Sequence, residues 1–174
     1  MIESIKWTER KFTFDFPVGV FPWIIERLRG TPARIEELIK DLRPAILTQR
    51  INGKWSIQEN IGHLIDVEEL HSNRVEDYRA GKKMLRPADM QNLRTVERDY
   101  NGRDIAAILQ SLRATRGDFV GKLEGMDEEM IGLALHHPRL NVPMRLIDMA
   151  YFVAEHDDFH LAVISRIAAT LRVQ

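Results

Sequence analysis

The chain has 174 residues and nearly balanced charge, with 25 lysines and arginines against 26 aspartates and glutamates and a formal net charge of −1. This length predicts one domain, residues 1–174, that can bury a core of its own. The lack of cysteine excludes disulfides, thiolate metal sites and a cysteine nucleophile, so His, Asp and Glu are the available metal ligands. The balanced charge gives no reason to expect nucleic acid as a partner.

The N-terminal sequence lacks the apolar core of a signal peptide. No apolar run approaches the roughly 18 residues that a membrane-spanning helix requires. We therefore expect a cytoplasmic protein that has no membrane partner.

Aromatic residues alternate with polar ones near the N-terminus, at Phe12, Phe14 and Phe16. This period of two is typical of a strand, but the segment is too short and isolated to build a sheet. We expect residues 1–19 to form an extended arm that packs on the domain, with at most a strand over residues 10–16.

Four long segments carry apolar residues at a period of about 3.6 residues and therefore predict four helices. These segments cover residues 20–42, 57–80, 103–124 and 143–171. The first is interrupted at Gly30, where Thr31 as N-cap and Pro32 in a first turn predict two collinear pieces, 20–29 and 32–42.

The starts of two later helices have sequence signals of their own. Ser56 and Glu59 form the S-x-x-E pattern of a capping box, in which each residue binds the backbone N–H of the other. This role accounts for Glu59 better than a role at a metal. Pro143 suits the first turn of the last helix.

Two long polar connectors, residues 82–102 and 125–142, separate the later helices. Connectors of this length in a small domain are usually functional or cross the molecule, and they allow consecutive helices to run parallel. We therefore expect an all-α four-helix bundle with no sheet beyond the arm.

Two histidines occur four residues apart in the last predicted helix, at His156 and His160. This spacing places both imidazoles on one face, which is otherwise an apolar stripe. Buried imidazoles need partners, so the pair either bonds to neighbours in the core or binds a metal ion. His63 lies at the edge of the apolar arc of the second long helix and is the candidate third ligand. Three histidines would leave coordination positions open, as catalytic sites do.

These residues resemble a known family, the DinB/YfiT-like superfamily. Residues 55–66 read WSIQENIGHLID and resemble its W-S-x-x-E-x-x-x-H-L-x-D signature. Residues 155–161 read EHDDFHL and resemble its final H-x-x-x-H, and Gly30-Thr31-Pro32 before the first amphipathic helix is similar to the start of the family. The resemblance spans roughly residues 24–170.

The resemblance implies a four-helix bundle of up-down-down-up topology. It also implies a divalent metal, commonly zinc, nickel or iron, held at the matching positions by His63, His156 and His160. Characterised relatives include bacillithiol- or mycothiol-dependent S-transferases, a maleylpyruvate isomerase and metal-dependent hydrolases, and many are homodimers. The family motif does not supply a substrate, a metal identity or a thiol.

Two polar residues within the apolar arc of the second long helix, Glu68 and His71, are candidate catalytic residues. A carboxylate and an imidazole on a buried face are either partnered structurally or functional. They can serve one another, pair with Arg113 or Arg116, or hold a substrate carboxylate or a catalytic proton.

Several other polar residues are expected to be structural or exposed. Asp66 could orient an imidazole, but a solvated position on its helix is favoured. The acidic residues around the last histidines lie off the apolar stripe, so we expect them at the surface or behind the ligands: Glu155, Asp157 and Asp158. We expect Arg74 and Arg79 to be surface charges. We expect His136 and His137 to be exposed in their connector, with a contact to a cavity rim or a substrate as the alternative to plain exposure, and not to bind a metal.

Two functions compete at this point. The first is a metal-dependent enzyme that acts on a small molecule, either as a transferase that uses a low-molecular-weight thiol or as a hydrolase. The second is a non-catalytic metal-binding or stress-responsive binding protein. An open site beside a cavity would favour the first, and a dry, collapsed site the second. From the resemblance and the apolar arm, we also expect a homodimer.

Overall fold

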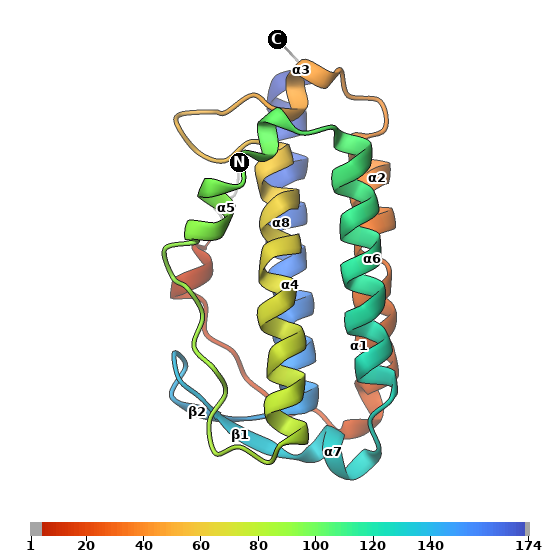
Figure 1. The fold of residues 1–174 in the computed structure, drawn as a ribbon, viewed down its shortest axis with the longest axis vertical. Coiled ribbons are helices and arrows are strands. Elements are labelled where there is room, and N and C mark those ends of the chain that lie inside the picture. The colour runs from red at the N-terminus through yellow and green to blue at the C-terminus, as the bar shows by residue number, and fades with distance from the viewer. Residues whose placement is uncertain (1–4, 173–174) are drawn as a thin grey trace.

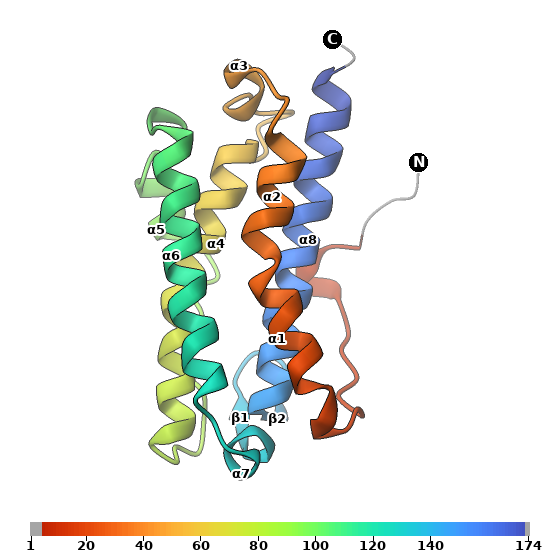
Figure 2. The same ribbon diagram turned by 90° about the vertical axis from the view of Figure 1, so that its right-hand side faces the viewer.

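The computed structural model describes residues 5–172, in which four helical columns stand side by side (Figures 1 and 2). The columns are α1 (Phe21–Arg29) followed by α2 (Thr31–Ile39), then α4 (Ile57–Arg79), α6 (Ile105–Glu124) and α8 (Leu146–Arg172). The α1–α2 column runs up, α4 and α6 both run down, and α8 runs up. The predicted up-down-down-up bundle is therefore confirmed. None of the described helices is long and apolar enough to cross a membrane.

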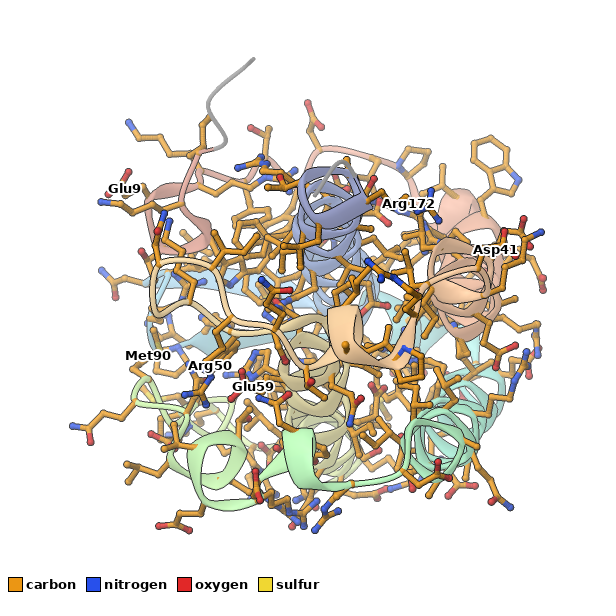
Figure 3. The ribbon with its side chains drawn as sticks, turned by 90° about the horizontal axis from the view of Figure 1, so that it is seen from above. Glu9, Asp41, Arg50, Glu59, Met90 and Arg172 are labelled. Atoms are coloured by element: carbon orange, nitrogen blue, oxygen red, sulfur yellow. The ribbon has the colours of Figure 1, made fainter. Side chains whose placement is uncertain are left out.

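Short elements join these columns. They are η1 (Trp7–Glu9), η2 (Val18–Val20), α3 (Pro44–Leu47), α5 (Leu93–Glu97), η3 (Tyr100–Gly102), α7 (Glu128–Gly132), β1 (Ala134–His137) and β2 (Val142–Arg145). Figure 3 looks down the bundle from the end where Arg50 and Glu59 lie. At this end, α4 begins with the predicted capping box: Ser56 accepts from the Glu59 N–H, and Glu59 accepts from the Ser56 N–H.

The break between α1 and α2 is milder than expected. Gly30 keeps a helical conformation and its carbonyl still accepts the Arg34 N–H at 3.0 Å, so the column is almost continuous. Thr31 is inside the helix and is not its N-cap, which corrects the prediction. Its hydroxyl instead donates to Asp157 on α8 at 2.7 Å, because that buried carboxylate needs hydrogen-bond donors.

The connector of residues 82–102 returns the chain from the lower end of α4 to the upper end of α6 (Figure 1). Its first part is fixed by Asp77 near the end of α4, which accepts from Lys82 and from the backbone and side chain of Arg86. Its second part, with α5 and η3, lies against α4. The connector therefore crosses the molecule and also lies along one side of α4.

The second connector contains a β-hairpin that the sequence analysis missed. Strands β1 and β2 pair antiparallel, with Leu135 opposite Met144 and His136 opposite Pro143. Pro143 is therefore in a strand and not in the first turn of α8, which begins at Leu146. The carboxylate of Asp148 accepts the Arg145 N–H at 2.8 Å and fixes this later start.

The N-terminal arm is extended between η1 and η2 and forms no strand in its described part, residues 5–19. Its aromatic rings pack on α8: Phe12 lies 4.9 Å from the Phe152 ring, and Phe16 lies 5.0 Å from Tyr151. These rings are half-buried against α8 of the same chain, and the homodimer stays a prediction.

Two apolar clusters fill the bundle, and a layer of polar side chains separates them. The lower cluster includes Phe21 and Phe119, and the upper includes Ile35 and Leu112. Every column contributes a buried polar residue between the clusters: Thr31, Glu68, His71, Arg116, Asp157 and His160. His63 borders this layer among the upper-cluster residues of α4. The candidate site lies in this layer.

Candidate metal centre

The structure brings together the three histidines that the sequence singled out. One nitrogen each from His63, His156 and His160 lies within 4.8 Å of the other two, and all three residues are buried. The Nε2 atoms of His156 and His160 are 3.2 Å apart. In a tetrahedral site with ligand distances of about 2.05 Å, nitrogens are separated by about 3.3 Å, so this pair already has the spacing of two ligands to one ion.

Asn60 determines which nitrogen of His160 is free. Its side-chain amide donates to the carbonyls of Trp55 and Ser56, so its Oδ1 is an acceptor. That oxygen lies 2.8 Å from Nδ1 of His160, which must therefore carry a hydrogen. Nε2 of His160 then presents a lone pair to the cluster.

Thr95 has the same effect on His63. Its hydroxyl donates to the Asp66 carboxylate at 2.9 Å, so its oxygen can only accept from Nδ1 of His63, 3.3 Å away. Nε2 of His63 is then also a lone pair. Asp66 is buried and also accepts from Tyr100 at 2.9 Å, which corrects its expected place in solvent.

Burial keeps these imidazoles neutral. It lowers the pKa of His63 to about 4, and it lowers the pKa of both His156 and His160 well below the ordinary value. Neutral imidazole is the form that binds a metal. Without a cation, the single Nε2–H that His156 could offer would satisfy only one of the two facing lone pairs. The donor set therefore fits a divalent ion.

Aromatic rings surround the three histidines. Trp7 from the arm lies 4.9 Å from His156, Trp55 lies 4.9 Å from His63, and Phe159 lies 5.2 Å from His160, all measured between ring centroids. The rings limit how the imidazoles can turn and form part of the wall of a cavity.

The cavity opens beside the histidines and has a volume of about 930 Å³. Its walls come from the arm, α4, α8, the hairpin and the connector of residues 82–102. A pocket of about 300–1,000 Å³ is the usual size for a small-molecule site. No fourth His, Asp or Glu joins the cluster within residues 5–172, so an ion there would keep positions open toward the cavity.

The two candidate catalytic residues lie in different surroundings. His71 lines the cavity, 6.4 Å from His156 between ring centroids. Glu68 does not line it and instead accepts from Arg116 of α6 at 2.8 Å. Burial raises the pKa of Glu68 to about 7, although Arg116 opposes the shift. Of the pair, His71 is the one that can touch a bound molecule.

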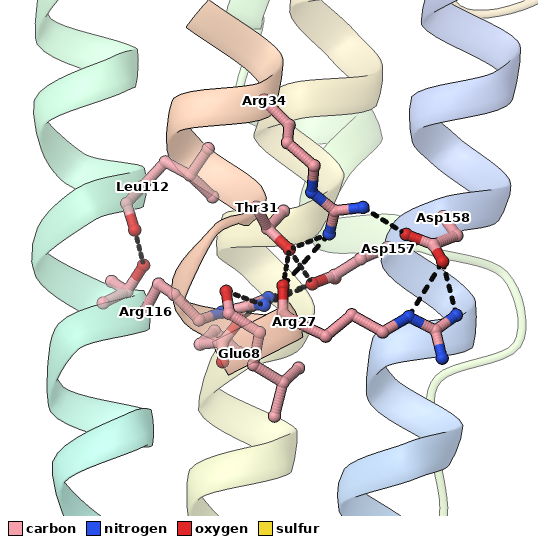
Figure 4. A network of polar contacts seen from close by, with 10 residues as sticks. Arg27, Thr31, Arg34, Glu68, Leu112, Arg116, Asp157 and Asp158 are labelled. Atoms are coloured by element: carbon pink, nitrogen blue, oxygen red, sulfur yellow. Dashed lines mark hydrogen bonds and ion pairs between the residues drawn. The ribbon is translucent and has the colours of Figure 1, made fainter. Parts of the chain in front are cut away.

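Arg116 is the centre of a buried ion network between the columns (Figure 4). It binds Asp157 as well as Glu68, and Asp157 also accepts from Thr31. Glu155 is buried in ion pairs with Arg10 and Arg27, and Asp158 binds Arg27 and Arg34.

Of the two positions expected for the acidic residues of α8, at the surface or behind the ligands, this network excludes the surface for two of them. Glu155 and Asp157 lie inside ion pairs and not at the surface, because arginines from other elements reach them. Neither belongs to the histidine cluster.

Two basic residues were also misplaced by the sequence analysis. Arg74 is only 2% exposed and donates to the Arg86 carbonyl, because the connector folds over it. His137 is 1% exposed, because the hairpin turns it inward on the same face as Leu135. Both line the cavity. The contributions of Asn60, Thr95, Trp7 and Arg139 to the site were not foreseen, because no short motif marks contacts between such distant segments.

Comparison with known proteins agrees with this architecture. The family model of the DinB superfamily matches residues 27–164. The chain belongs to the DinB superfamily. It resembles the solved structure of YfiT from Bacillus subtilis with a TM-score of 0.80 and 18% identity over 93% of each chain, which shows the fold. That protein is described as a probable metal-dependent hydrolase with an unusual four-helix bundle topology. No curated protein matches the chain significantly.

Proposed function

We propose that this protein is a divalent-metal-dependent enzyme that acts on a small molecule, with His63, His156 and His160 as the metal ligands. The observation that carries the proposal is the convergence of three neutral imidazoles on the wall of a large cavity. A divalent ion there would lower the pKa of a water or thiol and so supply a nucleophile near neutral pH. The YfiT description supports hydrolysis as the reaction class.

The chain's own residues prepare the site for this chemistry. Asn60 and Thr95 orient the imidazoles of His160 and His63 and keep their Nε2 atoms free. Trp7 and Phe159 form an apolar wall beside the histidines. His71 lies on the cavity side of the cluster and could exchange a proton with a bound molecule.

A thiol-dependent transfer is the second candidate reaction. The chain has no cysteine, so the sulfur nucleophile would have to be a separate low-molecular-weight thiol. A cavity of about 930 Å³ has room for a thiol together with a second substrate. Both reactions require the same ligands and differ only in the molecule that binds beside them.

A purely structural or sensory metal site is the alternative. Such sites usually surround the ion with four protein ligands, whereas this cluster has three within the described residues and opens to a cavity. The arrangement therefore supports catalysis over non-catalytic binding.

The metal is tested first. Protein purified without a metal-affinity tag should contain close to one zinc, nickel or iron per chain by elemental analysis, and His160→Ala should contain none. His136→Ala is the matched control, because that imidazole lies in the hairpin and bonds to Asn141. Equal metal in wild type and His160→Ala would refute the ligand assignment.

Activity is tested next on the metal-loaded protein. We expect it to hydrolyse members of an ester and amide panel, or to transfer a thiol to members of an electrophile panel, and His160→Ala to do neither. Turnover that persists in His160→Ala would contradict the metal-dependent reaction. Sedimentation at several concentrations tests the homodimer that we propose from the family resemblance, and a monomer throughout would reject it.

A further inference from the structure

One end of the cavity collects basic side chains around Phe152, one helical turn before His156 on α8. The guanidinium of Arg139 lies over the Phe152 ring at 5.6 Å, and the His137 ring lies 5.6 Å from the same ring. Arg74 and His71 face the same cavity from α4. The basic end is therefore about one turn, or roughly 6 Å, from the histidine cluster along α8.

His137 presents an unused hydrogen-bond donor there. Its Nδ1 accepts the N–H of Leu140 at 3.1 Å, so Nε2 carries the hydrogen of the neutral ring. Nε2 is buried and has no partner among the described residues. Burial, together with the charges of Arg74 and Arg139, lowers the pKa of His137 to about 3, so the ring stays neutral.

The two arginines lack acidic partners. No carboxylate of residues 5–172 lies within 4.0 Å of either Arg74 or Arg139. Nη2 of Arg139 is buried without a partner within that range, and Arg74 uses Nε and Nη2 on the Arg86 carbonyl alone. Asp77, three residues after Arg74 on α4, binds Lys82 and Arg86 instead.

This arrangement differs from that of the other buried or half-buried arginines around the bundle. Arg27, Arg34, Arg116 and Arg145 each bind at least one carboxylate. Burying a cationic group without a counter-charge is unfavourable, so positive charge with unused donors in a cavity indicates that an anion from outside completes the site.

We propose that Arg74, His137 and Arg139, here called the carboxylate pocket, bind the carboxylate of a small organic substrate. The inference rests on the proposed function, because it places the reacting part of that substrate at the histidine cluster. The planar fork of Arg139 suits the two oxygens of a carboxylate, and the His137 N–H and the remaining Arg74 nitrogen add donors. Trp7, Phe152 and Phe159 offer apolar surface to the body of the molecule.

The spacing also limits the substrate. His71 lies about one helical turn before Arg74 on α4, and its ring is 6.4 Å from the His156 ring. If the substrate carboxylate binds at Arg139, a substrate bond only a few atoms from that carboxylate can therefore reach the histidine cluster. The substrate class is a short or aromatic carboxylic acid whose reacting bond lies near its carboxylate.

Calorimetric titration of the full chain tests the inference with benzoate and its neutral isostere benzamide. We expect benzoate to bind at least tenfold more tightly than benzamide. Arg139→Gln should weaken benzoate about 10- to 100-fold, the range expected for the loss of a charged hydrogen bond, and leave benzamide unchanged. Arg79→Gln is the matched control, because Arg79 is an exposed arginine of the same helix as Arg74. It should bind benzoate like the wild type.

The titrations are repeated after a chelator has removed metal. Benzoate in the carboxylate pocket should still bind, and its binding should still be weakened by Arg139→Gln. If benzoate were held by the metal alone, its binding would be lost with the metal, and that loss would overturn the inference. Benzoate binding that is unchanged in both Arg139→Gln and Arg74→Gln would also overturn the inference. So would phenyl phosphate binding that depends on Arg139 and is tenfold tighter than that of benzoate. Because benzoate binding to the carboxylate pocket is measured on metal-free protein, a failure of this inference is distinguishable from a failure of the proposed metal centre.

Discussion

The hydroxyl of Thr95 determines which ring nitrogen of His63 carries the hydrogen. It connects the buried Asp66 carboxylate to Nδ1 of His63, and so leaves Nε2 of that ring free for a ligand role. Partners of this kind behind a metal ligand typically change metal affinity by 10- to 100-fold. The effect comes from orientation and tautomer, and the residue itself does not touch the ion.

Thr95→Val is therefore expected to weaken metal binding by about 10- to 100-fold while the fold is retained. Valine keeps the shape of threonine but cannot accept from His63, so the ring is free to turn and to change tautomer. Competition with a chelating dye measures the affinity. Thr115→Val is the control, because that hydroxyl only bonds to the backbone of its own helix. An unchanged affinity in Thr95→Val would mean that Thr95 does not orient His63.

Glu68 gives a pH-dependent prediction at the same scale. Burial raises its folded-state pKa from 4.5 to about 7, so the folded protein binds this proton more tightly than the unfolded chain. The stability that this proton contributes is fully present below pH ~4.5 and is lost as the pH rises through about 7.

We expect Glu68→Gln to gain stability relative to the wild type between pH 5 and pH 8, by an amount on the order of 1–3 kcal/mol. Glutamine still offers Arg116 an acceptor but does not titrate. Urea unfolding of both metal-free proteins at the two pH values gives the comparison. Parallel pH dependence of the two free energies of unfolding would show that Glu68 does not titrate in this range.

At the scale of the elements, the polar layer sets how the four columns align. Each column presents apolar residues above and below it, and Arg116 binds residues of α4 and α8 at one level (Figure 4). Sliding one helix by a turn would place a buried charge among apolar side chains, which is strongly unfavourable. The same alignment brings His63 of α4 to the level of His156 and His160.

The sequence predicted the columns well because each one has a local signal. The bounds of α4 follow from its capping box and from Gly81, which takes a positive φ of 59° just after the helix. The histidine cluster was also predictable, because His156 and His160 share one buried stripe and the family motif supplies His63.

What the sequence missed depends on distant partners. The burial of Asp157 depends on Arg116, 41 residues away, and that of Arg74 depends on the connector folding over it. The hairpin strands have only four residues each, too few for a period of two to be clear. A wheel of one helix shows its own apolar face but not the ion pairs that other elements bring.

Gly62 of α4 tests the packing of the connector. A Cβ there would lie 2.2 Å from the ring of Tyr100, which is 2% exposed and held by its hydrogen bond to Asp66. Alanine normally stabilises a helix interior relative to glycine by about 0.5–1 kcal/mol. We expect Gly62→Ala instead to destabilise the protein by about 1–3 kcal/mol through overpacking, as measured by urea unfolding.

Gly117 of α6 is the matched control for this change. A Cβ there meets nothing within 4 Å, so Gly117→Ala should raise the free energy of unfolding. If both alanines stabilise the protein, Tyr100 does not pack on α4 as the structure has it.

At the scale of the whole molecule, the histidine cluster joins segments that are far apart in the sequence. His63 belongs to α4, while His156 and His160 belong to α8, and Trp7 of the arm and Thr95 of the connector lie directly beside them. An ion held by all three histidines would cross-link two columns within the polar layer. Binding to the folded state alone stabilises a protein in proportion to the logarithm of ligand concentration over Kd.

Zinc in hundredfold excess over its Kd should therefore stabilise the metal-free protein by about 2.7 kcal/mol and raise its Tm by roughly 5–10 °C. Thermal unfolding followed by circular dichroism measures the shift. His160→Ala should show almost no shift, because two imidazoles from different helices bind zinc far more weakly than three. Magnesium should have little effect on the wild type, since it prefers oxygen ligands. If zinc raises the Tm of His160→Ala as much as that of the wild type, the stabilising ion binds elsewhere. Zinc then does not cross-link α4 and α8.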